Sequence, residues 1–262
     1  MAAAAVLATR VTRVANLRAQ DDAKPRGADH ANRRLSAAVV RSLAELIVAG
    51  DIPEGELLPP EAALTERFGV SRTVIREAAK RLEEKGLVVV AQGRGTQVAR
   101  SSAWNMLDPL VLGAMIDNDS SLSMLDDLTV VRGTLEAAMA GAVATRRSEV
   151  ELSRIEHALV AMQEAEHEND AFRQADALFH FTMMELSGNR LAANIARSLY
   201  GRALTSSRFQ GLAYPRAFES TLEEHTRVVD AIRARDAEAA ETAMRHHIFD
   251  SWQQRRFESE DD

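Results

Sequence analysis

Two short helical patterns followed directly by a hairpin pattern, in residues 59 to 98, restrict the fold more than any other feature of the chain. The first pattern begins after two prolines and ends at Gly69, which are ordinary start and stop signals for a helix. Ser71 is a suitable cap for a second helix, which covers residues 72 to 85. Two short helices joined by a tight glycine turn are typical of a helix-turn-helix motif.

The segments on either side of this pair complete a small domain. Before it, residues 32 to 49 carry apolar side chains at helical spacing, namely Leu35, Val39, Leu43, Leu46 and Ile47. After it, LVVVAQGRGTQVA has the pattern of two short β-branched strands around a turn at residues 93 to 95. Residues 31 to 100 are therefore predicted to form a winged helix-turn-helix domain, with three helices and a β-hairpin wing.

The remainder of the chain is predicted to be all-α. After a linker at residues 101 to 106, only helical periodicity appears, with breaks near residues 120, 148, 169, 188, 215 and 236. These breaks predict a bundle of six or seven helices over residues 107 to 256, so the expected fold class is mainly α. Residues 1 to 30 are predicted to be a disordered arm, and residues 257 to 262 an acidic tail.

Charge is distributed in the same two parts. The net charge is −7, yet residues 1 to 100 hold 16 Lys and Arg against 12 Asp and Glu, whereas residues 101 to 262 hold 16 against 27. A basic N-terminal part and an acidic C-terminal part indicate that only the N-terminal part contacts nucleic acid. The absence of Cys excludes disulfides and thiolate catalysis. No apolar run is long enough to span a membrane. A cytoplasmic, nucleoid-associated bacterial protein is expected.

Cations gather at the N-terminal end of the second helix of the pair, where Arg72 and Arg76 lie one turn apart. A helix with several cations is usually a solvated surface, and neighbouring glutamates offer ordinary partners. This end of the helix, however, enters the major groove in helix-turn-helix proteins, and Arg pairs well with guanine. Ser71, Thr73 and the free amides can hold phosphate. Arg94, between two glycines at the hairpin tip, can reach the minor groove or the backbone.

Four polar side chains in the rear part are predicted to face one interior. Asp176 and His180 are four residues apart, on a helix face that also carries large apolar side chains. His225 lies on another helix, and His247 lies on the apolar stripe of the last helix, which His246 does not share. A single histidine of this kind is usually a satisfied core or surface residue. Bundle interiors, however, bring such ligands together, and three imidazoles with a carboxylate suit Zn²⁺, Ni²⁺, Mn²⁺ or a similar divalent ion.

Arg132 lies in the middle of an apolar stripe, so its guanidinium is predicted to be buried and to need an anion. Glu136, four residues on, is the structural partner, whereas a bound carboxylate is the functional one, which a planar guanidinium suits. The sequence leaves both open. No catalytic residue is predicted, because Glu224 beside His225 is expected to point elsewhere on its helix and no other general base is evident.

The stretch LLPPEAALTERFGVSRTVIREAAKRLEEKGLVVVAQGRGTQV resembles the winged helix of the GntR superfamily of transcription factors. The resemblance implies that the two helix arginines read the operator, and that the wing tip consists of Arg94, Gly95 and Thr96. One position departs from the pattern, because Ala62 stands where some relatives have a DNA-contacting Arg. Either that contact is lost or the operator differs.

The rear part resembles the FCD domain, the effector-binding helical bundle of the FadR-type GntR subgroup. The similarity lies in VVRGTLEAA, LSGN, EEH and AMRHH and in the Asp–His pair, over residues 106 to about 255. It implies a divalent metal held by Asp176, His180, His225 and His247, and a small organic acid steadied by Arg132. The segment WNMLDPLVLGAMIDND is similar to galactonate-responsive members, which implies a sugar acid as the effector.

These features favour a ligand-responsive transcription factor and not an enzyme. A homodimer would place two recognition helices on a palindromic operator in double-stranded DNA, and the acid would release a repressor from it. Two alternatives remain open. One is a metal-sensing regulator, whose metal occupancy would fall below about pH 6 as the histidines gain protons. The other is a metallo-hydrolase tethered to DNA.

Overall fold

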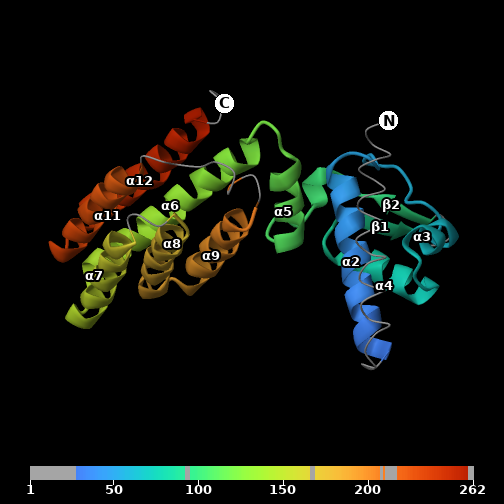
Figure 1. The fold of residues 1–262 in the computed structure, drawn as a ribbon, viewed down its shortest axis with the longest axis horizontal. Coiled ribbons are helices and arrows are strands. Elements are labelled where there is room, and N and C mark those ends of the chain that lie inside the picture. Colours follow the sequence, from blue (N-terminus) through green and yellow to red (C-terminus); the bar gives the residue numbers. More distant parts are fainter. Residues whose placement is uncertain (1–27, 92–94, 166–168, 207–208, 210–216, 259–262) are drawn as a thin grey trace. The chain divides into compact units, whose positions relative to one another are not determined.

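The computed structural model describes residues 28–91, 95–165, 169–206, 209 and 217–258, and it divides into two compact units at residues 118 and 119 (Figure 1). The two units are considered separately. Arg94, residues 259 to 262 of the expected acidic tail and nearly all of the expected arm lie outside the described residues, whereas residues 257 and 258 belong to the last helix. Within the part that the structure describes, no helix is both long and apolar enough to cross a membrane.

The first unit contains a helix-turn-helix motif followed by a two-stranded wing, as the sequence predicts. Strands β1 and β2 pair antiparallel, with Val88 opposite Val98 and Val90 opposite Thr96. The elements of the unit are α2 (Ala28–Val48), α3 (Glu61–Phe68), α4 (Arg72–Glu84), β1 (Val88–Ala91), β2 (Gly95–Val98), a short 3-10 helix (Ser101–Ala103) and α5 (Pro109–Asn118).

Local signals set the turn between α3 and α4. Gly69 ends α3 in the left-handed conformation, with φ +63°, which glycine adopts without steric cost. Ser71 then caps α4, because its side chain accepts a hydrogen bond from the backbone N–H of Val74. The inner face of α4 is fully apolar and packs into one core with α2, whose main members are Val39, Leu43, Leu46, Ile75, Ala78 and Leu82.

Helix α5 belongs to the first unit, although the sequence places it at the start of the second domain. Val111 is completely buried in the core that α2 and α4 share, and Leu110 and Met115 pack against the same core. Helical periodicity alone does not reveal this, because an apolar face does not specify the partner that covers it. The structural boundary therefore follows Asn118.

The second unit is a bundle of helices. Those with described bounds are α6 (Ser123–Arg146), α7 (Glu149–Glu164), α8 (Asn169–Leu186), α9 (Arg190–Leu204), α11 (Ala217–Arg233) and α12 (Ala237–Glu258). The long helix α6 packs against α8, α9, α11 and α12, so it is the axis of the bundle (Figure 1). Ser148 starts α7 with a capping box that it forms with Glu151. The mainly α fold that the sequence predicts is confirmed.

Gly86 offers a test of the first unit's backbone. It has a φ of +73°, and an added Cβ would lie 2.2 Å from the backbone oxygen of Ala103. Gly50 has a similar φ of +76°, but nothing lies within 4 Å of its added Cβ. G50A should therefore lower the free energy of unfolding by about 1–2 kcal/mol, which is the cost of placing alanine in the left-handed conformation. G86A should lower the free energy of unfolding by more, about 3–4 kcal/mol, because the backbone of Ala103 must also move.

Urea denaturation of the full chain, followed by far-UV circular dichroism, measures both changes. Equal losses of stability for G86A and G50A would contradict the close approach at Gly86, since the two positions differ mainly in what an added methyl group meets.

Candidate functional site

The first candidate surface is the N-terminal end of α4. Ser71, Arg72, Thr73 and Arg76 are all exposed there, while the opposite face of the helix is buried in the core. The structure thus brings together the four helix residues that the sequence assigns to DNA. Exposed guanidinium groups beside a helix N-terminus suit the edges and phosphates of duplex DNA.

Arg76 is held by an acidic neighbour on the other helix of the motif. Its Nε donates to both carboxylate oxygens of Glu61, at 3.0 and 3.1 Å. This hydrogen bond, followed by the charge of Glu61, raises the pKa of Arg76 above its ordinary value. Only Nε is engaged in these contacts, so the pair orients the guanidinium without using its terminal amino groups. No local pattern in the sequence predicts this pair.

At the wing, the structure describes two of the three predicted residues. Gly95 is exposed and has a φ of +91°, so its conformation favours glycine. Thr96 is half-buried, and its carbonyl accepts a hydrogen bond of 2.7 Å from the N–H of Leu58. Arg94 lies outside the described residues.

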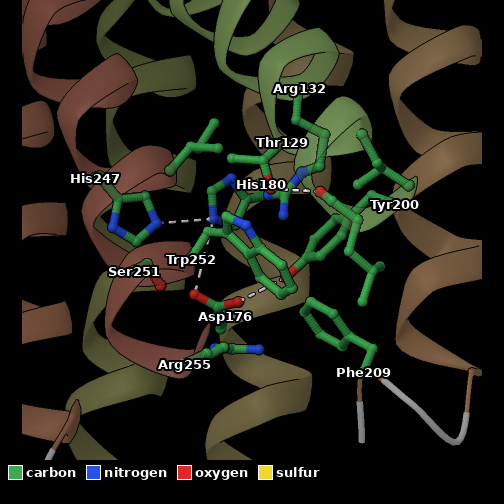
Figure 2. A pocket seen from close by; sticks show the side chains of 13 residues that line it. Thr129, Arg132, Asp176, His180, Tyr200, Phe209, His247, Ser251, Trp252 and Arg255 are labelled. Carbon is green, nitrogen blue, oxygen red and sulfur yellow. Dashed lines mark hydrogen bonds and ion pairs between the residues drawn. The ribbon is translucent and has the colours of Figure 1, made fainter. Parts of the chain in front are cut away.

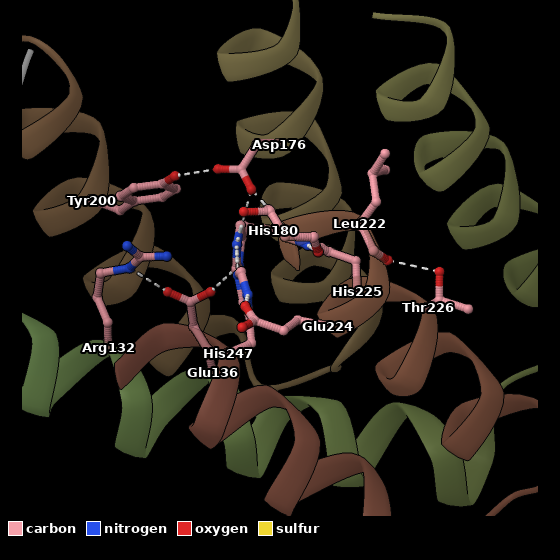
Figure 3. A network of polar contacts seen from close by, with 11 residues as sticks. Arg132, Glu136, Asp176, His180, Tyr200, Leu222, Glu224, His225, Thr226 and His247 are labelled. Carbon is pink, nitrogen blue, oxygen red and sulfur yellow. Dashed lines mark hydrogen bonds and ion pairs between the residues drawn. The ribbon is translucent and has the colours of Figure 1, made fainter. Parts of the chain in front are cut away.

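The second candidate site is a buried cluster in the helical bundle, formed by Asp176, His180, His225 and His247 (Figure 3). Asp176 and His180 come from α8, His225 from α11 and His247 from α12. Each offers one ligand atom, and these atoms all lie within 4.8 Å of one another. The structure therefore brings together all four residues that the sequence places in one interior.

The outer nitrogen of each imidazole has an acceptor. Nδ1 of His180 lies 2.6 Å from Oε2 of Glu136, and Nδ1 of His247 lies 2.8 Å from Oε2 of Glu224. Nδ1 of His225 lies 2.7 Å from the carbonyl oxygen of Thr221. An acceptor at Nδ1 favours the tautomer that carries its proton there. The three Nε2 atoms then present lone pairs to the centre of the cluster.

These lone pairs fit a cation. Nε2 of His180 and Nε2 of His247 are 3.2 Å apart. Nε2 of His225 is buried and has no hydrogen-bond partner among the described residues, although Oδ1 of Asp176 lies 3.3 Å away. Unsatisfied acceptors of this kind are costly in a protein interior. A divalent metal would satisfy them, and the set of imidazole and carboxylate ligands suits one.

Asp176 is held in the charged form that a cation requires. Its Oδ2 accepts a hydrogen bond of 2.8 Å from the hydroxyl of Tyr200, which leaves Oδ1 toward the imidazoles (Figure 3). Burial opposes ionisation, but the electrostatic interactions with the neighbouring imidazoles, His180 first and then His225, outweigh it and lower the pKa of Asp176 below its ordinary value. Tyr200 is not among the site residues that the sequence predicts, because a buried Tyr is usually an ordinary core residue.

Two of the histidines are neutral near pH 7. Burial, followed by the neighbouring His247, lowers the pKa of His225 well below its ordinary value. Burial, followed by His180, lowers the pKa of His247 to about 3. Neutral imidazole is the form that binds a metal, so these two ligands are in the binding form without loss of a proton.

Glu136 is the anion that the structure places beside the guanidinium of Arg132, for which the sequence left Glu136 and a bound carboxylate open. Its Oε1 accepts a hydrogen bond of 2.7 Å from Nε of Arg132, and the guanidinium also lies over the ring of Tyr200, 3.5 Å from its centroid. Burial opposes the charge of Glu136, but Arg132 and then His180 lower its pKa to about 2. Glu136 is thus the structural partner of Arg132, and it also contacts a histidine of the cluster.

Glu224, which the sequence predicts to point elsewhere on its helix than His225, contacts another histidine of the cluster. The side chain reaches Nδ1 of His247, on the side opposite the centre of the cluster. Burial and the nearby Asp250 raise the pKa of Glu224 to about 7. Its contact is with the outer nitrogen of the ring, and it does not line the neighbouring pocket. The geometry therefore assigns Glu224 to the orientation of His247.

A pocket adjoins the cluster, and Figure 2 shows the side chains that line it. Its empty volume is about 430 Å³, part of it open to solvent. Its wall includes the charged or metal-binding side chains of Arg132, Asp176, His180 and His247. It also includes three residues that carry hydroxyl groups, Thr129, Tyr200 and Ser251. Arg132 therefore lines the pocket in addition to its contact with Glu136, so its guanidinium can bind an anion in the pocket. Concave sites with a few convergent polar groups are typical ligand sites.

A winged helix joined to a helical bundle with a polar pocket defines a DNA-binding transcription regulator with a ligand-binding part. Comparison with known families agrees: residues 35–98 match the bacterial regulatory proteins of the gntR family, and residues 127–250 match the FCD domain. The chain belongs to the GntR family of bacterial regulatory proteins and carries an FCD domain.

Individual relatives support this assignment. The chain is 34% identical to the galactonate operon transcriptional repressor of Escherichia coli over 207 residues, which cover 78% of this chain and 90% of the repressor. It is 29% identical to the transcriptional repressor NanR of Cronobacter sakazakii, over 85% of this chain and 87% of NanR. The solved structure of Lar, which controls the expression of the Listeria monocytogenes agr system, matches with a TM-score of 0.59 at 17% identity, over 85% of this chain and 96% of Lar.

Proposed function

We propose that the chain is a repressor that leaves its operator when a small sugar acid binds at a metal site in the second unit. The observation that carries this proposal is the set of three imidazoles and one carboxylate whose ligand atoms lie within 4.8 Å of one another, three of the four residues lining a pocket that Arg132 also lines. In one place it provides ligands for a cation and a guanidinium for an anion.

The first unit would read the operator. Arg72 and Arg76 would contact base edges in the major groove, with Ser71 and Thr73 on phosphates and the wing tip on the adjacent backbone. Glu61 would orient Arg76 before DNA is met. A homodimer would place two such helices on a palindromic site, which matches the two-fold symmetry usual for these motifs.

The second unit would bind the effector. Asp176 and the three histidines would hold a divalent ion of the Zn, Ni or Mn class, with Glu136, Glu224 and the carbonyl of Thr221 fixing the rings. The bound ion supplies a positive charge that accepts oxygen ligands from the acid. Arg132 would bind the carboxylate of the acid, and the hydroxyl groups of the pocket would bind its hydroxyls.

The choice of a sugar acid rests on the polar lining of the pocket and on the relatives. Thr129, Tyr200 and Ser251, each of which carries a hydroxyl group, line the pocket beside the cluster, and such residues suit a polyhydroxylated ligand. One similar protein is named for the galactonate operon, so aldonic acids are the first class to test. Binding would change operator affinity only if the acid prefers one arrangement of the protein, with about 1–3 kcal/mol of coupling.

The test is the anisotropy of a labelled operator fragment, selected from genomic DNA with the metal-loaded full chain. A panel of aldonic acids is added with and without prior removal of metal by a chelator. At least one acid should lower operator affinity about 5- to 150-fold, and only in the metal-loaded protein. If the metal alone changes affinity and no acid adds to it, the protein is a metal sensor. If no acid and no metal has an effect, the proposal fails.

A further inference from the structure

A second guanidinium lines the pocket beside the cluster. Arg255 comes from α12, one turn after Ser251, and it is half-exposed. Its Cζ lies 4.8 Å from the ring centroid of Phe209, which also lines the pocket. In Figure 2, Arg132 and Arg255 lie at opposite ends of the pocket, with His180 and Trp252 between them.

Arg255 differs from the neighbouring arginines in its partners. Arg132 is hydrogen-bonded to Glu136, and Arg256 forms an ion pair with Asp126. Arg255 makes no hydrogen bond and no ion pair with any residue that the structure describes; its guanidinium lies over the ring of Phe209, and its charge also acts on Asp176 and Tyr200. The contact with Phe209 fixes the guanidinium at the pocket wall and leaves its N–H donors for another group.

The described side chains that line the pocket include two guanidinium groups and one carboxylate. The carboxylate is that of Asp176, whose Oδ1 faces the imidazoles and on which the charge of Arg255 also acts. Glu136, which does not line the pocket, forms an ion pair with Arg132. Arg255 forms no ion pair with a described carboxylate, so a ligand with a single carboxylate at Arg132 would leave its guanidinium without a hydrogen-bonded anion.

We propose that Arg255 is a second anion subsite and that the effector is a sugar acid with an anionic group at each end. One carboxylate meets Arg132 and the centre of the cluster, the hydroxyls lie along Thr129 and Ser251, and the second anionic group pairs with Arg255. This inference rests on the proposed function, and it narrows the ligand from monoacids to dianions. Guanidinium–carboxylate pairs in such a pocket are the stronger kind of hydrogen bond, so selectivity follows from them.

The test compares two acids that differ only at the far end, galactarate with two carboxylates and galactonate with one. Their dissociation constants are measured by isothermal titration calorimetry on the metal-loaded full chain. The wild type should bind galactarate about tenfold or more tightly than galactonate, which is the effect of one charged hydrogen-bonded pair. R255Q should lose most of this preference while its affinity for galactonate changes less than about threefold.

Two further variants sharpen the comparison. R255K keeps the charge and should retain part of the preference for the dianion, although it lacks the planar fork. R245Q removes an exposed arginine of the same helix that does not line the pocket, so it should retain the full preference. Far-UV circular dichroism shows whether each variant is folded.

The outcomes separate the two proposals. If the wild type binds galactonate as tightly as galactarate, or if R255Q weakens both acids equally, the anion subsite is refuted while the proposed function stands. If neither acid binds the metal-loaded wild type, the anion subsite is refuted, and the panel of acids tested on operator affinity decides the proposed function. A preference for galactarate that R255Q abolishes supports the subsite.

Discussion

Replacing both Arg72 and Arg76 with alanine is expected to weaken binding of the operator at least about 30-fold, because each bidentate pair between Arg and guanine contributes about 1–3 kcal/mol. Both side chains are exposed, and Arg76 contacts only Glu61 among the described residues, so their removal should leave the helix intact. Fluorescence anisotropy with the selected operator and with an unrelated duplex of equal length measures the effect. The loss should be much larger on the operator, since base contacts carry the sequence preference.

The matched control is R81A. Arg81 lies on the same helix but is paired with Glu77 one turn before it, and it is remote from the N-terminal end. Its replacement should change operator affinity less than threefold, as expected of a surface pair. Retention of the operator by R72A/R76A at wild-type affinity, with the fold intact by circular dichroism, would show that α4 is not the reading helix.

Replacing His247 with alanine is expected to abolish metal binding at stoichiometric concentrations. The change removes one of four ligand atoms that lie within 4.8 Å of one another. Loss of residues that merely support ligands already costs about 10- to 100-fold in metal affinity, so loss of a ligand should cost at least about 100-fold. Competition with a chromophoric chelator measures the affinity, and the metal content after gel filtration gives the stoichiometry.

Thermal unfolding gives an independent measurement. Metal at 100 times its dissociation constant should stabilise the wild type by about 2.7 kcal/mol, provided that the unfolded chain does not bind it. H247A should show no such gain. H246A is the matched control, because His246 is exposed beside the buried His247 and touches none of the cluster. If H247A binds metal as the wild type does, the cluster is not the metal site. H225Q is a second variant in case H247A folds poorly.

The sequence predicted the first unit almost completely, because the signals for it are local. Gly69 and Ser71 determine where one helix ends and the next begins through their own backbone and side-chain chemistry. The same reasoning distinguished His247 from His246. Burial follows the period of the helix, and on α12 it leaves His246 exposed while His247 is buried.

The contacts that the sequence missed depend on what another helix presents. The period of α11 places Glu224 away from the direction of His225, and that is correct, but it does not reveal that His247 of α12 lies in Glu224's direction. Helix α5 joined the first unit because α2 offers it an apolar face. Arg255 was missed because nothing local distinguishes a half-exposed arginine at a pocket wall from one in solvent.

Glu136 connects two parts of the second unit that would bind different things. One carboxylate oxygen accepts from Arg132, on the side of the acid, and the other lies against Nδ1 of His180, on the side of the cation. An anion that draws Arg132 toward itself must weaken its hold on this carboxylate, which then becomes a stronger acceptor for the imidazole. The affinities for acid and for metal are therefore linked, and by thermodynamic reciprocity each should change in the presence of the other by the same factor.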